Sequence, residues 1–199
     1  MAAQTFIRWA KLGVWGRLLA RAQEGGVALG MTFLDGTTIR AHQKQPGRPK
    51  RADGAQRDVR EALGRSRGGY GTKAVVIADG AGRAIAFALA PGQAHELPMG
   101  PELLDGLPDV PLWVVGDKGY ASHEFRARVW DAGARPAIPH KRNEAPVACP
   151  AWIYNNRNMV ERLWARLKEW RAVATRYEKT AISFMGVLCL AAALAWIKT

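Results

Sequence analysis

The sequence predicts an α/β fold in which helices flank a mixed sheet of about five strands. Three strand-like segments follow one another, and the order then changes to strand, helix, strand, helix. The chain has 199 residues, of which 48% are hydrophobic, and this is enough for one globular domain with a substantial core. Both observations favour a single mixed sheet.

The chain begins with a basic segment, residues 1–24, for which we expect a short helix anchored by apolar residues. Over the whole chain, 29 Lys and Arg residues stand against 17 Asp and Glu residues, which gives a net charge of +12. Such a balance favours a polyanionic partner, nucleic acid before an anionic membrane. Many basic proteins bind no DNA, so charge alone does not decide the partner.

The first strand is predicted at 31–41, with Asp35 in its middle. Residues 40–69 are rich in Gly, Arg, Lys and Gln and contain nine basic residues against three acids, which predicts a loop or disordered insertion. The next two apolar runs, 73–78 and 84–89, predict strands joined by the hairpin signal at 79–82.

The second half of the chain alternates between helices and strands. A modest helix is expected at 95–104, and a buried strand at 111–115 runs into Gly116 and Asp117. Ser122 is a suitable N-cap for a helix that reaches Ala132. A short strand at 135–138 and a linker at 145–150 follow.

The C-terminal segment 181–197 is almost wholly apolar. We interpret it as a buried helix, and the alternative is a membrane anchor, because 17 residues is the short limit of the ~17–25 that span a bilayer. Neither Cys149 nor Cys189 has a second Cys or His nearby at metal-ligand spacing, which argues against a zinc site or a disulfide framework and suits a reducing cytosol. No signal peptide is expected, because Lys11, Arg17 and Arg21 interrupt the N-terminal apolar residues.

The helix predicted before this segment has an unusual polar face. At ~100° per residue, Tyr154, Arg157, Glu161 and Lys168 fall within about 60° of one another. A second side of the same helix carries an apolar stripe, which we expect to pack into the core and which consists of Val160, Leu163, Leu167 and Trp170. One carboxylate among cations often faces a phosphate or a metal.

Two further acids, Asp35 and Asp117, lie in or next to apolar strands. An unpaired buried charge is costly, so such acids are usually neutral, paired or metal-bound. For each there is also a simpler interpretation, a turn or cap before Gly36 or before Gly119. If the two aspartates converge with Glu161, divalent cations are needed to offset their repulsion, and an all-oxygen site suits Mg²⁺ or Mn²⁺. Two such ions support phosphodiester chemistry.

These residues resemble the catalytic part of a DDE transposase of a bacterial insertion sequence, in the group marked by a Tyr-x2-Arg-x3-Glu-x6-Lys signature. The four signature residues match every spacing: Tyr154, Arg157, Glu161 and Lys168. Asp35 in FLDGTTIRAH and Asp117 in GDKGYAS match the contexts of the two aspartates of the group. The resemblance runs from about residue 5 to the C-terminus.

The resemblance implies a ribonuclease-H-like fold and metal-dependent cleavage and strand transfer at transposon ends, without a covalent protein–DNA intermediate. It implies that Asp35, Asp117 and Glu161 hold two Mg²⁺ or Mn²⁺ ions. The DNA-binding residues that it implies are Tyr154, Arg157, Lys168, Arg65 and Arg67. Trp164 lies near the face of Glu161, where it would either stack on a displaced base or pack into the core.

Full-length members of this group carry an N-terminal helix-turn-helix region that binds the inverted repeats. We therefore expect residues 1–30 to be a remnant of that DNA-binding region and 31–199 to be the ribonuclease-H-like domain, with the basic loop insertion at 40–69. The expected partners are the terminal inverted repeats and target DNA, with a homodimer in the active complex, in the bacterial cytoplasm at the nucleoid. The alternatives are a non-catalytic DNA-binding fragment that modulates a full-length transposase, and a ribonuclease-H-like nuclease.

Overall fold

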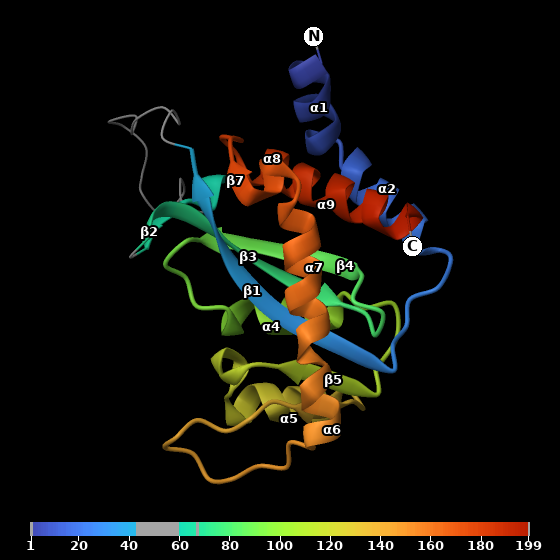
Figure 1. Ribbon diagram of the computed structural model, residues 1–199, viewed down its shortest axis with the longest axis vertical. Coiled ribbons are helices and arrows are strands. Elements are labelled where there is room, and N and C mark those ends of the chain that lie inside the picture. The colour runs from blue at the N-terminus through green and yellow to red at the C-terminus, as the bar shows by residue number, and fades with distance from the viewer. Residues whose placement is uncertain (1, 43–59, 67, 199) are drawn as a thin grey trace.

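A mixed sheet forms the centre of the protein (Figure 1). The computed structural model describes residues 2–42, 60–66 and 68–198. Five strands form the body of the sheet in the order β4-β3-β1-β5-β6, antiparallel from β4 to β1 and parallel from β1 to β6. They are β1 (Met31–Ala41), β3 (Gly69–Ala78), β4 (Ala84–Pro91), β5 (Trp113–Gly116) and β6 (Arg135–Ala137). The predicted α/β fold with a mixed sheet is confirmed.

Two short strands were not predicted. β2 (Gly64–Ser66) pairs with the start of β3, and β7 (Thr175–Arg176) pairs with the end of β1. Both ends of the segment 40–69, predicted as loop, are therefore strand, because each end finds a neighbour in the sheet that the local sequence does not reveal. The interior of that segment, residues 43–59 and Arg67, lies outside the described residues.

The side chains of β1 alternate between two cores. Phe33 and Ile39 pack with Val160, Leu163 and the C-terminal helix on one face. Leu34 packs with the opposite core, which contains Phe125. This alternation follows from the two-residue period of a strand, and it places Asp35 on the same face as Phe33.

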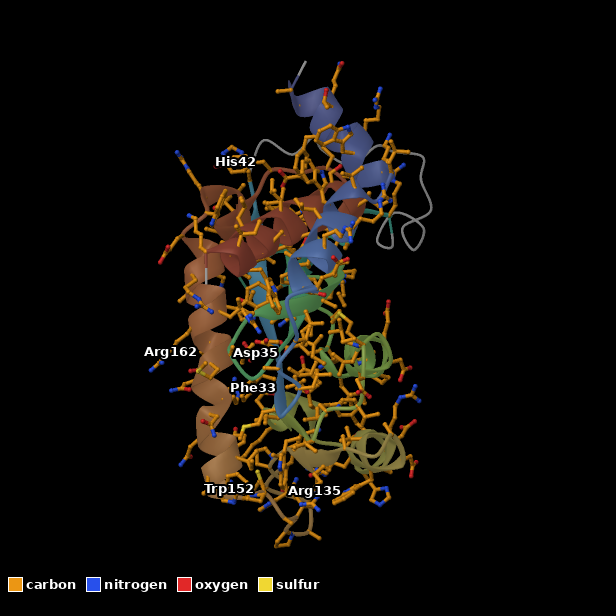
Figure 2. The ribbon with its side chains drawn as sticks, turned by 90° about the vertical axis from the view of Figure 1, so that its right-hand side faces the viewer. Phe33, Asp35, His42, Arg135, Trp152 and Arg162 are labelled. Atoms are coloured by element: carbon orange, nitrogen blue, oxygen red, sulfur yellow. The ribbon has the colours of Figure 1, made fainter. Side chains whose placement is uncertain are left out.

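Helices cover both faces of the sheet (Figure 2). One face carries the 3₁₀ turn η1 (Leu97–Met99), α4 (Gly100–Asp105), the turn η2 (Lys118–Tyr120) and α5 (His123–Asp131). Ser122 caps α5 as predicted, because its hydroxyl accepts the Phe125 N–H at 3.0 Å.

The other face carries the helix with the signature residues, which is interrupted. It consists of α6 (Ala151–Tyr154), a 3₁₀ turn η3 (Asn155–Arg157) and α7 (Asn158–Lys168), and α8 (Arg171–Ala174) follows. Val160, Leu163 and Leu167 are buried as predicted, but Trp170 is 42% exposed. The expectation for Trp170 was wrong because α7 ends at Lys168, so the helical period no longer applies there.

The C-terminal segment forms α9 (Ala181–Ile197), whose residues Phe184, Leu188 and Ala193 are fully buried. Among the helices of the described residues, none is both long and apolar enough to cross a membrane. The interpretation of this segment as a buried helix is confirmed.

The N-terminal segment forms two helices instead of one, α1 (Ala2–Lys11) and α2 (Val14–Gln23). They are separated at Gly13, whose φ of 70° is a conformation that glycine adopts readily. Both helices contact α9, and Leu19 of α2 is buried in the core that α9 shares. That residues 1–30 derive from a DNA-binding region stays a prediction.

Candidate active site

Asp35 and Asp117 lie side by side at the point where the pairing of β1 with β5 ends. The parallel register pairs Leu34 with Gly116, the last pair of this ladder. Asp35 and Asp117 are the next residue on each strand, so the sheet itself brings them side by side. The side chain of Asp35 is only 13% exposed.

Asp117 also has a local structural role. Its carboxylate accepts the N–H of Gly119 at 2.7 Å and thereby caps η2. The simpler interpretation of Asp117, a turn or cap residue before Gly119, is therefore correct for this residue. A carboxylate has more acceptor positions than one hydrogen bond uses, so the cap leaves Asp117 able to bind a cation.

Arg157 connects Asp35 to Glu161. Its Nη2 donates to Asp35 Oδ1 at 2.9 Å and its Nη1 to Glu161 Oε1 at 2.7 Å. Burial alone would lower the pKa of Arg157, but the carboxylates of Asp35, Glu161 and Asp117 together outweigh that effect and raise it. One cation thus joins an acid of β1 to an acid of α7.

Asp35 lies in a strongly perturbed electrostatic setting. Its pKa is raised from 3.8 to about 6: burial raises it most, Arg157 lowers it, and the carboxylates of Glu96 and Asp117 also raise it. A carboxylate that is desolvated beside other carboxylates is stabilised by additional positive charge.

The remaining signature residues lie on the same side of β1. Lys168 donates from Nζ to Thr37 Oγ1 at 2.6 Å, two residues along the strand from Asp35. Tyr154 is half-buried; burial raises the pKa of its hydroxyl, and it interacts electrostatically with Arg157 and Asp117. The structure therefore brings together Tyr154, Arg157, Glu161 and Lys168 with both aspartates.

The two basic loop residues and Trp164 lie elsewhere. Arg65 is exposed on β2, away from α7, and Arg67 lies outside the described residues. Trp164 is 4% exposed and its ring packs 6.1 Å from that of Phe87. Of the two interpretations of Trp164, core packing is the one that the structure supports.

Sequence reasoning missed Glu96 and Lys73. They form an ion pair at 2.8 Å, with side chains 18% and 17% exposed. Glu96 lies over Gly36, where an added Cβ would be 2.3 Å from the carboxyl carbon of Glu96. A glycine inside a strand often marks a close approach, so Gly36 was the available signal.

Glu96 belongs to the same electrostatic cluster as the aspartates. Burial raises the pKa of the Tyr120 hydroxyl, and Glu96, Asp35 and Asp117 each raise it further. These three carboxylates therefore lie close enough together for each to raise the pKa of the same hydroxyl, that of Tyr120.

The carboxylate oxygens of Asp35, Asp117 and Glu161 are of the kind that bind a divalent cation. In this structure the guanidinium of Arg157 supplies the positive charge instead. In this conformation no three His, Cys, Asp or Glu side chains of the described chain are arranged to hold a metal ion. Asp35 and Glu161 both bind the Arg157 guanidinium instead. Hard oxygen donors from β1, from the end of β5 and from α7 are the ligand set that Mg²⁺ and Mn²⁺ prefer, once Arg157 withdraws.

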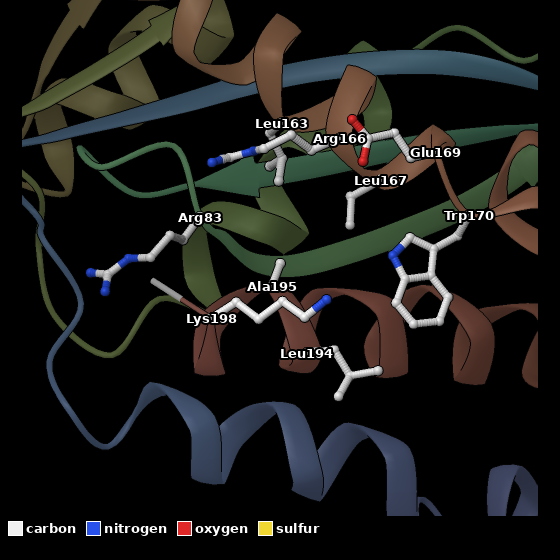
Figure 3. Close-up of a pocket in the computed structure, with 9 residues that line it drawn as sticks. All are labelled: Arg83, Leu163, Arg166, Leu167, Glu169, Trp170, Leu194, Ala195 and Lys198. Carbon is white, nitrogen blue, oxygen red and sulfur yellow. The ribbon is translucent and has the colours of Figure 1, made fainter.

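A separate cavity of about 180 Å³ lies between α7 and α9 (Figure 3). Its arginines are already bonded within the protein. Arg166 donates to the Gly82 carbonyl at 2.6 Å, and Arg83 pairs with Asp79 and lies 3.8 Å from the ring centroid of Trp196. Packing between the two helices accounts for this cavity.

The chain is similar in sequence to known transposases. Two family models, both described as "Transposase DDE domain", match residues 30–147 and 114–198. A putative transposase for insertion sequence element IS6501 from Brucella ovis is 30% identical over 131 residues, which cover 64% of this chain and 98% of that protein.

A solved transposase structure has a similar fold. The piggyBac transposase in a synaptic complex with hairpin DNA matches with a TM-score of 0.51 and 11% identity, over 89% of this chain. This chain spans about half of that protein, 49% of its length. The Mos1 transposase in a paired-end complex matches with a TM-score of 0.35 and 15% identity, over 98% of this chain and 61% of that one.

Proposed function

This chain belongs to the DDE transposase family, and we propose that it cleaves DNA at the ends of an insertion sequence and joins those ends to target DNA. The observation that carries the proposal is the Arg157 bridge, which brings Asp35 and Glu161 to one cation beside Asp117. In this family of enzymes such an acidic site belongs with divalent cations.

We propose Asp35, Asp117 and Glu161 as the ligands of two Mg²⁺ or Mn²⁺ ions. Ions bound there would supply activation of the attacking water or 3′-hydroxyl and stabilisation of the leaving oxygen. The protein contributes the position of the acids: the register of β1 and β5 fixes both aspartates, and α7 fixes Glu161. Arg157 keeps the two acids it bridges neutralised until the ions replace it.

We propose that three further side chains bind DNA. Lys168, held at Thr37 two residues from Asp35, offers a cation to a phosphate next to the reacting one. Arg157, once released from its carboxylates, and Tyr154 extend the same surface. Phosphate contacts of this kind position DNA without reading its sequence.

The proposed assembly is a homodimer on bacterial chromosomal DNA, in the cytoplasm. Strand transfer needs two transposon ends held together, which two copies of one chain can provide. The proposed DNA partners are the terminal inverted repeats and the target.

Cleavage of DNA that bears the element's own ends, in the presence of Mg²⁺ or Mn²⁺, tests the proposal. The chain should cleave it, and Asp117→Ala should abolish cleavage. Asp131→Ala, which removes an exposed aspartate at the end of α5, is the matched control and should cleave as the parent does. Unchanged cleavage by Asp117→Ala would contradict the assignment of that acid.

The same preparation separates the rival functions. Cleavage of an RNA–DNA hybrid without cleavage of the DNA ends would identify a ribonuclease-H-like nuclease. Binding to DNA with steep salt dependence and no turnover would identify a fragment that modulates a full-length transposase.

A further inference from the structure

We propose that Glu96 is a fourth acid of the metal site and that it binds the cation at Asp35 from the opposite face of β1. Glu96 is the residue that precedes the turn η1, and it joins Asp117 and Glu161, the other acids proposed for this site. The inference rests on the proposed function, because it adds a ligand to the metal site proposed there.

The sheet is open on one edge of β1 beside Asp35. β3 occupies the other edge from Phe33 to Arg40. On the open edge, the pairing with β5 ends at Leu34 and the pairing with β7 begins at Arg40. Among the described strands, none pairs on that edge with residues 35–39. Side chains from the two faces of the sheet can therefore approach one another there.

Glu96 lies against β1 at this opening, over a glycine. Gly36 is two residues from Leu34, so its open side belongs to the face that contains Leu34 and not to the face of Asp35. A Cβ added at Gly36 would lie 2.3 Å from the carboxyl carbon of Glu96 and 2.6 Å from each of its oxygens. The carboxyl group of Glu96 therefore occupies the space that a side chain at position 36 would fill, next to Asp35.

Lys73 holds Glu96 in this position. Its Nζ donates to Glu96 Oε1 at 2.8 Å, and both side chains are largely buried. The ion pair uses one oxygen of the carboxylate, which has acceptor positions on both oxygens. Glu96 can therefore keep its contact with Lys73 and bind a cation through Oε2.

A buried hydroxyl lies at the same acids. Tyr120 is fully buried, and its hydroxyl forms no hydrogen bond of ordinary geometry with the residues that the structure describes. Of the three carboxylates that raise its pKa, Glu96 has the largest effect, before Asp35 and Asp117. A buried hydroxyl without a partner is costly, and a water bound to a cation among these acids would give it one.

The acids on the two faces of β1 are neutralised in the same way. Arg157 binds Asp35 and Glu161 on one face, and Lys73 binds Glu96 on the other. The charge of Glu96 nevertheless raises the pKa of Asp35, so the two acids interact across the strand. A cation between them would remove this repulsion.

The affinity of the chain for Mn²⁺ at pH 8 without DNA, measured by electron paramagnetic resonance of the free ion, tests the role of Glu96. Glu96→Gln keeps the size of the side chain and an oxygen that accepts from Lys73, and it removes only the charge. Its affinity should be about ten-fold weaker than that of the wild type, because one anionic ligand is lost. The matched control is Glu102→Gln, an exposed acid of α4, which should bind as the wild type does.

Gly36→Ala tests the position of Glu96 without removing a charge. The added methyl group takes the place of the Glu96 carboxyl group, so Mn²⁺ binding should again weaken by about ten-fold. In a Glu96→Ala background the space is free, and the same substitution should change the affinity by less than about two-fold. Denaturant unfolding of each variant shows that it is folded.

The outcomes separate this inference from the proposed function. If the wild type binds Mn²⁺ and Asp35→Asn weakens binding while Glu96→Gln does not, the role of Glu96 is overturned and the site of three acids stands. An effect of Gly36→Ala that is equally large with and without Glu96 would also overturn it, because the loss would not depend on Glu96. A wild type that binds no Mn²⁺ would overturn the proposed metal site and the role of Glu96 together.

Discussion

Arg157 binds Asp35 at 2.9 Å although the two residues lie 122 positions apart in the chain. The same guanidinium binds Glu161 at 2.7 Å. An arginine that neutralises two acids is an alternative to a bound cation, so the metal-free protein avoids leaving a buried carboxylate unpaired. At the proposed metal site, a divalent cation and the Arg157 guanidinium therefore compete for the negative charge of Asp35 and Glu161, and this makes the bridge testable.

Removing Arg157 should strengthen metal binding and weaken catalysis. In Arg157→Gln, Asp35 and Glu161 no longer have the competing guanidinium, and we expect the affinity for Mn²⁺ without DNA to rise by roughly ten-fold at pH 8, where Asp35 is ionised. End cleavage should fall, because a proposed DNA contact is lost.

The measurement is a calorimetric titration with Mn²⁺ alongside the cleavage assay. Arg162→Gln, which removes an exposed arginine of the same helix, should change neither quantity. An Mn²⁺ affinity unaffected by Arg157→Gln would show that this side chain does not compete with metal.

Asp35 should make the folded protein less stable as the pH rises. Its pKa is about 6 in the folded protein against 3.8 as the reference value. Between these values the folded state holds a proton that the unfolded state has released, so the free energy of unfolding falls by roughly 3 kcal/mol as the pH rises through 6.

Asp35→Asn lacks this titration. Urea unfolding of the wild type and of Asp35→Asn at several pH values measures the difference, which should shift in favour of the Asn variant between pH 4 and pH 7. Parallel pH profiles would mean that the pKa of Asp35 is not raised.

The sequence predicted correctly those features that depend only on residues near one another in the chain. The strand that carries Asp35, the cap at Ser122 and the helical spacing from Arg157 to Lys168 are local properties, and the structure shows each of them. The Arg157 bridge was not predicted, because helical geometry gives the angle between Arg157 and Glu161 but not the distance from Arg157 to β1. Glu96 was missed for the same reason, since only the fold brings it over Gly36.

Trp164 should contribute to the stability of the fold and not to DNA binding. Its ring is buried against Phe87, so Trp164→Ala should lower the free energy of unfolding by about 3–5 kcal/mol. Trp164→Phe keeps an aromatic ring in the core and should cost much less. Denaturant unfolding gives both values, and DNA affinity is measured on the Phe variant, which should bind as the wild type does. A loss of DNA binding by a stably folded Trp164→Phe would instead favour base stacking.

The proposed role of Asp35, Asp117 and Glu161 as metal ligands is tested most directly by Mn²⁺ binding at pH 8. Electron paramagnetic resonance of the free ion measures the binding. The wild type should bind Mn²⁺, and Asp35→Asn, Asp117→Asn and Glu161→Gln should each weaken binding by about ten-fold or more, since each removes one anionic ligand. Glu169→Gln, which removes an exposed acid just after α7, should bind as the wild type does. Wild-type affinity in all three ligand variants would show that these acids do not form a metal site.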